Sequence, residues 1–282
     1  MAYLIACCDG HGMETAGKRT PALKTDLTFR GKVYKAGTSI RENDFNENIM
    51  EKFIEGCKRC GINTLQVAPG DTDIPLATRV STANSKGANL YISFHANALT
   101  GAWQTGAYGL VVIKHATTQA LTDTLATNVY NYLKDNIEWY SNGGTKYGVR
   151  RDVDISGFSL YVLKNTSMPA ILVEYGFMDN WEDVKRMCTD KFSTDCAENT
   201  LKGVCKTLGV TYKAPTSTTE PFIVRIISNT LNIRSDASIN ADIVGKVYKG
   251  EAYTIIEEKN GWGKLKSGAG WISMGASYVE KL

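Results

Sequence analysis

The sequence predicts an α/β protein in which a mainly parallel, twisted sheet is flanked by helices and is followed by a small all-β barrel. Up to about residue 210, short apolar runs alternate with stretches whose apolar residues recur at helical spacing. Strands that alternate with helices in this way form parallel sheets covered on both faces. Beyond a segment rich in Pro, Ser and Thr, only short strand patterns separated by turns follow. We therefore divide the chain into a first domain at 1–211, a linker at 212–221 and a second domain at 222–282.

The first half of this first domain is predicted to contain three strands, a small hairpin and two helices. The strands lie at 3–8, 63–68 and 91–97, the hairpin around 29–33, and the helices at about 45–57 and 76–84. In the first helix, apolar residues recur every four positions from Phe45 to Cys57, which gives one apolar face. Asn43 or Asp44 is the expected N-cap, so Glu42 is expected just outside the helix.

The rest of the chain continues the same two patterns. The first domain adds strands at 108–113, 159–163 and 170–175, a helix at 121–137 and a last helix that ends at 208. The second domain is predicted to contain strands at 224–227, 231–234, 243–247, 252–257, 261–266 and 270–273. About sixty residues of short strands joined by tight turns are typical of a small barrel.

Composition excludes several classes of function. The chain is 43% hydrophobic and 22% charged, as in an ordinary globular protein with a core. Its net charge of +3 is too small, and too evenly spread, to indicate a nucleic acid partner.

No apolar run has the length of a membrane-spanning helix, so no stable membrane insertion is expected. The N-terminal apolar run is short and ends at Asp9-Gly10-His11, which does not fit a signal peptide. We expect the protein to be made in the cytoplasm without a signal peptide. If it acts outside the cell, we expect it to be released by a route other than cleavage of a leader.

The seven cysteines indicate reduced, buried thiols. The count is odd, and Cys7 and Cys8 fall inside a predicted strand, which does not suit a disulfide framework. Cys57 and Cys60 have the spacing of a redox motif, but they lie at the end of a helix pattern with no second pair nearby. Packing of the helix is the favoured interpretation, and a redox role is a distant alternative.

Two of the chain's three histidines lie where predicted strands end. His11 follows the first strand and His95 ends the strand at 91–97, so both are expected at the crevice where open α/β sheets bind ligands. Glu42 is expected within reach of the same crevice. Two imidazoles and a carboxylate, with a fourth position for water, are the ligands of a catalytic Zn²⁺. Glu174 interrupts an apolar strand and is the candidate general base for the water. The third histidine, His115, is predicted to be a surface residue in an exposed loop.

Six segments, in order, give the first domain a much more specific resemblance. They are Asp9–Gly12, Lys18–Pro21, Arg41–Asn43, Ser93–Asn97, Leu160–Asn165 and Val173–Asn180. Together they resemble the zinc-dependent N-acetylmuramoyl-L-alanine amidases of the third type, which occur in bacterial autolysins and phage endolysins.

The resemblance implies that His11, Glu42 and His95 hold zinc and that Glu174 is the catalytic acid/base. It also implies hydrolysis of the amide between the muramic acid lactyl group and the L-alanine of the stem peptide. Arg79 and Asn97 match positions near the substrate groove. One position departs from the family pattern, because family members often have an aspartate where Cys8 stands here.

The second domain resembles a bacterial SH3 module, on the segments Thr230–Ser235, Gly245–Glu251, Asn260–Lys264 and Gly270–Ile272. Such modules commonly bind peptidoglycan peptides. Trp262 and Trp271 are candidates for the binding surface, and the core of the barrel is an equally good assignment for them. Linking a hydrolase to a wall-binding module would raise the local substrate concentration.

The leading hypothesis is therefore a peptidoglycan amidase of the endolysin or autolysin kind, with bacterial peptidoglycan as its partner. Two alternatives stay open: a zinc peptidase that cuts within the stem peptide, and a non-catalytic wall-binding protein whose first domain is inactive. The sequence leaves open whether the source is a phage or a bacterium, the peptidoglycan chemotype, the oligomeric state and the binding face of the barrel.

Overall fold

The computed structural model describes residues 2–117, 119–137, 139, 148–215, 221–259 and 261–282. The chain divides into two compact units, Met1–Ala214 and Pro215–Leu282. Each unit is described by itself. Residues 216–220 of the predicted linker lie outside the described ranges.

The first unit is built on a six-stranded sheet. Its strands are β1 (Leu4–Cys8), β4 (Asn63–Gln66), β5 (Leu90–Asn97), β6 (Leu110–Lys114), β7 (Gly148–Arg151) and β8 (Ala170–Phe177). Its helices are α1 (Glu42–Arg59), α2 (Leu76–Ser85), α3 (Ala120–Asn136), α4 (Asp152–Ser156), α5 (Tyr161–Asn165), α6 (Trp181–Met187) and α7 (Asp190–Leu208). A separate hairpin, β2 (Leu27–Phe29) with β3 (Lys32–Tyr34), confirms the one predicted around 29–33.

The strands of this sheet are mostly parallel. In the order β4-β1-β5-β8-β6-β7, the first four strands run parallel to one another. Strand β6 is antiparallel to β8, and β7 runs parallel to β6. The predicted class, a mainly parallel sheet flanked by helices, is confirmed.

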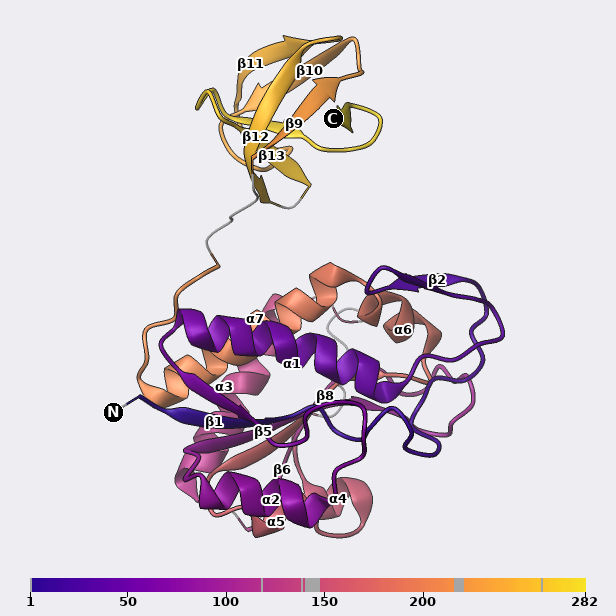
Figure 1. Cartoon of the computed structure of the whole chain (residues 1–282), viewed down its shortest axis with the longest axis vertical. Helices are drawn as coiled ribbons and strands as arrows, with labels where there is room; N and C mark the ends of the chain where they lie inside the picture. The colour runs from indigo at the N-terminus through magenta and orange to yellow at the C-terminus, as the bar shows by residue number, and fades with distance from the viewer. Residues whose placement is uncertain (1, 118, 138, 140–147, 216–220, 260) are drawn as a thin grey trace. The chain divides into compact units, whose positions relative to one another are not determined.

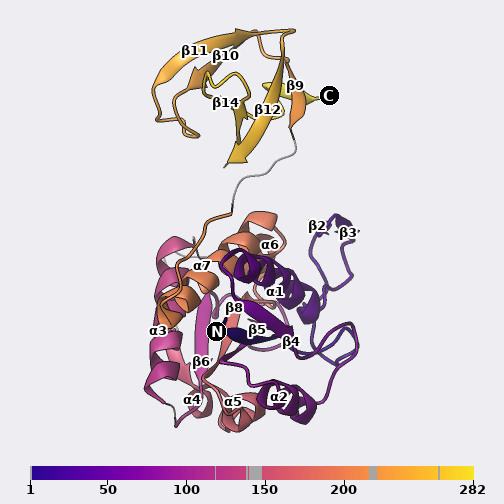
Figure 2. The ribbon, with the colours of Figure 1, turned by 60° about the vertical axis from the view of Figure 1, so that its left-hand side comes forward.

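Each face of the sheet has its own layer of helices (Figures 1 and 2). Helices α1, α3 and α7 pack on one face, over side chains such as Ile92 and Val173. Helices α2 and α5 pack on the other face, over Tyr91 and Leu172. Because side chains alternate along a strand, His95 and Glu174 project to the same face as Tyr91 and Leu172. The site side chains therefore lie on the face that carries α2 and α5.

Two local predictions are wrong. The segment 159–163 was predicted as a strand, but the chain forms the short helix α5, Tyr161–Asn165. Its buried residues, Val162 and Leu163, are an apolar pair too short for periodicity to distinguish helix from strand. Helix α1 begins at Glu42 and not after it, because the Glu42 N–H bonds to the Lys18 carbonyl oxygen (3.0 Å) and Arg41 takes the N-cap position.

The second unit is an all-β structure, as predicted, and its strands pair antiparallel. Its strands are β9 (Phe222–Ile226), β10 (Thr230–Arg234), β11 (Ile243–Tyr248), β12 (Ala252–Lys259), β13 (Trp262–Leu265), β14 (Trp271–Ser273) and β15 (Val279–Lys281). The last strand was not predicted, and it pairs with β9. Buried aliphatic residues, among them Val224, Ile255 and Ile272, form a core of its own. Among the helices of the described ranges, none combines the length and apolar character needed to cross a bilayer.

Candidate metal centre

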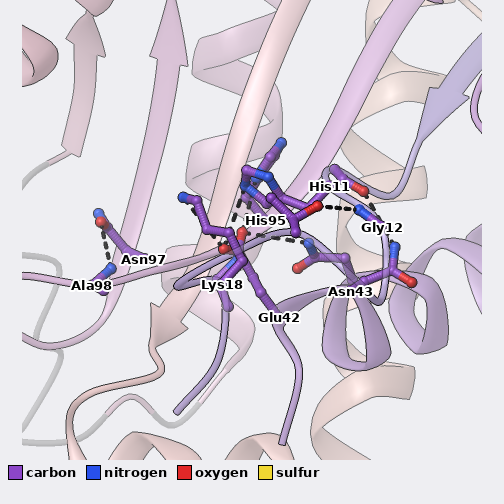
Figure 3. Close-up of polar contacts among 12 residues, drawn as sticks. His11, Gly12, Lys18, Glu42, Asn43, His95, Asn97 and Ala98 are labelled. Carbon is purple, nitrogen blue, oxygen red and sulfur yellow. Dashed lines mark hydrogen bonds and ion pairs between the residues drawn. The ribbon is translucent and has the colours of Figure 1, made fainter. Parts of the chain in front are cut away.

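The structure brings together three side chains that are far apart in the sequence. His11 lies in the turn after β1, Glu42 is the first residue of α1, and His95 lies near the end of β5. One potential ligand atom from each of the three lies within 4.8 Å of the other two. Figure 3 shows the three side chains converging, with Lys18 beside Glu42.

The turn that carries His11 has an unusual backbone shape. Gly10 has φ +59°, and a Cβ atom at this position would collide with the imidazole ring of His95. His11 itself has φ +26°, a conformation that side-chain-bearing residues rarely adopt and that is concentrated at functional sites. The Asn43 amide holds the turn by donating to the carbonyl oxygens of Asp9 (3.4 Å) and Gly10 (3.2 Å). The first residues of α1 thus stabilise the turn that positions His11.

Arg79 stabilises the same turn through hydrogen bonds. Its guanidinium group, 2% exposed, donates to the His11 carbonyl oxygen (3.3 Å), the Cys8 thiol (3.1 Å) and an Asp73 carboxylate oxygen (2.7 Å). The sequence predicted Arg79 as a groove residue, and the structure places it against the groove with its donors engaged by the protein. At the position where family members often have an aspartate, the Cys8 thiol accepts a hydrogen bond from this arginine.

The charges at the centre favour an ionised Glu42 carboxylate beside a neutral His11 imidazole. Glu42 is 1% exposed, and burial opposes its ionisation, but the nearby His95, His11 and Lys18 outweigh burial and lower the pKa of Glu42 to about 2. Its oxygens lie 3.0 Å from His95 Nδ1 and 3.4 Å from His11 Nε2. Burial lowers the pKa of His11 to about 4, so His11 is neutral at pH 7 and can act as a metal ligand.

Two observations indicate that this set fits a metal ion. Among the described residues, the buried Oε2 atom of Glu42 accepts no hydrogen bond and has only longer contacts, to His11 Nε2 (3.4 Å) and the Lys18 ammonium (3.6 Å). A buried carboxylate oxygen in this state is suited to a closer cation. Ser93 Oγ lies 3.0 Å from Nε2 of His95, so the hydroxyl orients the ring with Nδ1 toward Glu42. Two imidazoles and one carboxylate are a zinc donor set that leaves room for a further ligand.

Glu174 lies beside the three candidate ligands. It is on β8, in register with His95 on the neighbouring parallel strand β5. Burial raises the pKa of Glu174 to about 7, and its Oε2 atom has no hydrogen-bond partner in the described part of the chain. A carboxyl group with such a pKa can take up and release a proton near neutral pH.

A cavity of about 660 Å³, here called the groove, opens at this centre. Its polar end is lined by residues that include His11, Lys18, His95, Asn97 and Glu174. Asn97, predicted to lie near the groove, lines it, and its side-chain oxygen accepts the N–H of Ala98 (2.8 Å). No role was predicted for Lys18, although it lies in one of the motifs. Its ammonium is 3.6 Å from Glu42, so it adds positive charge to this end of the groove.

The prediction that His115 is an exposed surface residue is wrong. Its side chain is only 18% exposed, and Nδ1 lies 2.9 Å from a carboxylate oxygen of the fully buried Asp152. Asp152 begins α4, 37 residues further along the chain. The residues next to His115 in the sequence do not indicate Asp152 as its partner, because only the folded chain brings the two side chains together.

The two tryptophans of the second unit have different surroundings. Trp271 on β14 is 7% exposed, and the Lys264 ammonium lies 5.6 Å from the centre of its ring. Trp262 on β13 is half-buried. Trp271 therefore contributes mainly to packing, and Trp262 offers the larger free surface of the two.

Comparison with known proteins identifies a family for each unit. A family model described as N-acetylmuramoyl-L-alanine amidase matches residues 5–206, which is more than half of the chain. A second model, described as a bacterial SH3 domain, matches residues 229–280. Among curated proteins, the chain is 29% identical over 190 residues to the endolysin of Bacillus phage SPP1. That alignment covers 64% of this chain and 62% of the endolysin, so the chain spans about six tenths of the relative's length.

Further relatives and solved structures agree. A germination-specific N-acetylmuramoyl-L-alanine amidase of Bacillus subtilis is 27% identical, over 60% of this chain and 72% of its own length. The catalytic domain of the amidase CwlV from Bacillus (Paenibacillus) polymyxa superimposes with a TM-score of 0.58 at 19% identity, covering 74% of this chain and 99% of that domain. An amidase from Clostridium difficile 630 also superimposes with a TM-score of 0.58, at 23% identity, covering 74% and 97%. These superpositions show the shared fold of the first unit.

Proposed function

The chain belongs to the N-acetylmuramoyl-L-alanine amidase family, and from this premise we propose that it is a zinc-dependent peptidoglycan hydrolase. The bond cleaved is the amide between N-acetylmuramic acid and the L-alanine of the stem peptide. The observation that supports zinc is the convergence of His11, Glu42 and His95 around a buried carboxylate oxygen that lacks a hydrogen-bond partner in the described chain.

In this proposal His11, Glu42 and His95 would hold the ion. Bound zinc supplies a Lewis acid that activates water for attack and polarises the scissile carbonyl group. Ser93 and Glu42 keep the His95 ring in one orientation, and the Arg79 guanidinium and the Asn43 amide keep the His11 turn in its strained shape. Preorganised ligands of this kind reduce the cost of reaching the productive geometry.

Glu174 is the proposed general base and then general acid. Its carboxylate takes the proton of the attacking water and delivers it to the nitrogen of the departing L-alanine. The pKa of about 7 that burial imposes lets the same carboxyl group do both near neutral pH. The Lys18 ammonium lies at the same end of the groove. Its positive charge stabilises substrate oxygens that gain negative charge during the reaction.

Digestion of purified cell walls, followed by mass spectrometry of the products, tests the reaction. An amidase leaves free lactyl groups on the glycan strands and free amino groups on L-alanine, whereas a stem-peptide peptidase leaves alanine attached to the glycan. We expect the first result, its loss with a chelator, and its return on addition of zinc. Peptide fragments still joined to muramic acid would instead support the zinc peptidase, and intact walls would support a non-catalytic binding protein.

We further propose that the second unit binds the cell wall, on the basis of its match to the bacterial SH3 family. It has its own buried core, so removal of residues 221–282 leaves the core of the first unit intact. The shortened chain should adhere less to walls while still hydrolysing a soluble muropeptide. Equal adhesion would show that the module binds something else. Because peptidoglycan lies outside the cytoplasmic membrane, the proposed site of action is the wall, after release from the cell.

A further inference from the structure

The groove has a second half whose chemistry differs from that of the metal centre. There its lining includes six apolar residues from two separate segments: Ile74, Pro75, Leu76, Ile155, Leu160 and Tyr161. Three of them are exposed although they are large and apolar: Leu76 by 49%, Ile155 by 39% and Tyr161 by 45%. We call these six residues the apolar half of the groove. Exposed apolar side chains gathered along a cavity indicate a ligand-binding surface.

The same cavity extends without interruption to the metal centre. Leu172 on β8 lines it two residues before Glu174, and Ile113 on the neighbouring strand β6 lines it as well. Leu172 and Ile113 belong to the sheet face that also carries His95 and Glu174. A substrate whose scissile bond lies at the metal centre therefore has part of its length over the apolar half.

The segment that carries Ile155, Leu160 and Tyr161 is hydrogen-bonded to Asp152. The fully buried Asp152 carboxylate accepts the backbone N–H of Val153 (2.9 Å) and of Leu160 (3.0 Å), at the two ends of the segment. It also accepts the backbone N–H of Ala116 (3.0 Å) and contacts His115. These hydrogen bonds fix the backbone that carries this side of the apolar half.

The other side of the apolar half is fastened to the same segment. Helix α2, which begins at Leu76, packs against α5, which begins at Tyr161, and the Asn84 amide donates to the Asn165 carbonyl oxygen (3.1 Å). Asp73, an acid that lines the groove next to Ile74, has both carboxylate oxygens engaged, by Arg79 (2.7 Å) and by the Thr15 hydroxyl (2.5 Å). The Ser156 hydroxyl, which also lines the groove, donates to the Asp152 carbonyl oxygen (2.7 Å). This half therefore offers a ligand few polar groups besides the Tyr161 hydroxyl.

From this arrangement we propose that the apolar half binds the stem peptide. The methyl group of L-alanine, the residue next to the scissile bond, occupies the part of this half nearest the metal centre. This inference rests on the proposed function, because it assigns one side of the same scissile bond. A sugar ring carries several hydroxyl groups, each of which loses water in a site without hydrogen-bond partners. A peptide that starts with alanine presents methyl and methylene groups, which gain from contact with Leu76, Ile155 and Tyr161. The residues of the apolar half thereby determine specificity for the peptide.

The test compares substrates that differ in peptide length or in glycan length. The zinc-loaded full chain is assayed on a muramoyl dipeptide, a muramoyl tetrapeptide and a disaccharide tetrapeptide, and kcat and KM are measured separately. The test variant is the double substitution Ile155→Ala with Tyr161→Ala. The matched control is Phe158→Ala, since Phe158 is 63% exposed in the same segment but does not line the groove. Zinc content and thermal melting show that each variant is folded.

We expect the double variant to raise KM for both tetrapeptide substrates by about tenfold or more, the range expected for lost apolar pocket contacts, with kcat changed by less than about threefold. The rise in KM should be smaller for the muramoyl dipeptide. It should be the same for the muramoyl tetrapeptide, which has one sugar, as for the disaccharide tetrapeptide, which has two. Phe158→Ala should behave like the wild type. If the double variant does not fold, Leu76→Ser, on the opposite side of the groove, should give the same ranking of substrates.

Three results would overturn the inference. A loss that follows glycan length would assign the apolar half to the sugar. An equal loss on all three substrates would confine the contact to the muramoyl and first peptide residues that all three share, and so would refute binding of the longer stem peptide. No loss at all would show that these side chains do not contact the substrate. The proposed function is tested separately, by the product masses of the wild type. A wild-type chain that leaves the muramic acid–alanine bond intact in every substrate would refute both proposals.

Discussion

In the described part of the first unit, two buried carboxylates form close pairs with histidines, Glu42 with His95 and Asp152 with His115, and the pairs differ in what surrounds the carboxylate. His95 Nδ1 lies 3.0 Å from Glu42, and His115 Nδ1 lies 2.9 Å from Asp152. Both acids are buried, at 1% and 0% exposure. Each histidine lies at or just after the end of a strand, β5 for His95 and β6 for His115.

The difference lies in how the hydrogen-bond donors are distributed over the two oxygens of each carboxylate. Asp152 accepts backbone N–H groups from Ala116, Val153 and Leu160 in addition to its contact with His115. In Glu42 the donors from His95, Ala96 and Asn46 all reach Oε1. Its Oε2 accepts no hydrogen bond in the described chain, with His11 Nε2 at 3.4 Å and Lys18 at 3.6 Å. A carboxylate whose oxygens all accept hydrogen bonds stabilises the fold, whereas a buried one with an oxygen that accepts none and a second imidazole nearby is suited to a cation. The first arrangement is a structural clamp and the second is the proposed metal centre.

The largest expected effect comes from removing one imidazole from each pair. His95→Ala should lose bound zinc and lower wall hydrolysis by on the order of 10³-fold or more, because catalysis by the activated water is lost. His115→Ala, the matched control, should retain one equivalent of zinc. Metal content by mass spectrometry and turnover on purified walls measure both. Equal zinc loss in the two variants would erase the distinction between the pairs.

The next effect separates metal binding from proton transfer. Glu174→Gln should keep its zinc, since the three ligands are untouched, and should lower kcat by about 10²- to 10⁴-fold, the usual contribution of a general acid or base. Zinc content and kcat are measured on the same sample. A variant with wild-type kcat would exclude Glu174 as the base, and one without zinc would show that it helps to bind the metal.

A smaller effect is expected on stability at the clamp. His115→Ala leaves Asp152 buried with its backbone donors only, which should cost about 1–3 kcal/mol of unfolding free energy. The melting temperature should fall by several degrees. His11→Ala, measured in the chelated protein, serves as the comparison. Its imidazole makes no hydrogen bond to a carboxylate among the described residues, so its removal should lower the melting temperature less. A melting temperature unchanged by His115→Ala would show that Asp152 does not need its histidine.

The smallest effect is a pH dependence. Burial opposes ionisation of Asp152, but hydrogen bonds from His115, Leu160 and Val153 outweigh it and hold the pKa below its ordinary value. The ordinary aspartate pKa is about 3.9. The ionised form therefore adds stability above that pH, and this stability is lost as the pH falls through the lower pKa of the folded state. Melting temperatures between about pH 5 and pH 2 should decline less steeply in Asp152→Asn than in the wild type. Parallel declines would contradict the assignment.

The fold class followed from patterns that reach across the whole chain. Alternating strands and helices gave the mainly parallel sheet, and turn-punctuated short strands gave the second unit. His11 and His95 were chosen because each lies at a strand end, where neighbouring parallel strands bring side chains together. Glu42 and Glu174 stood out as acids in or beside apolar patterns. These features are local in sequence, so one chain suffices to find them.

What could not be predicted depends on contacts between distant segments. Asp152 meets His115 only in the folded chain, and nothing near either residue signals the pair. The role of Arg79 beneath the His11 turn likewise requires Cys8 and Asp73 to be in place. The apolar half of the groove joins segments about eighty residues apart, and its second segment contains the helix α5 that the sequence suggested as a strand.

The most direct test of the central claim is an anomalous difference map, collected at the zinc edge from crystals of the zinc-loaded protein. We predict one strong peak, about 2.0–2.2 Å from a nitrogen of His11, a nitrogen of His95 and an oxygen of Glu42. Ser93 and Asp152 should contact their histidines as they do here. A peak at Cys57 and Cys60, or no peak near His11 and His95, would contradict the metal centre and the reaction assigned to it.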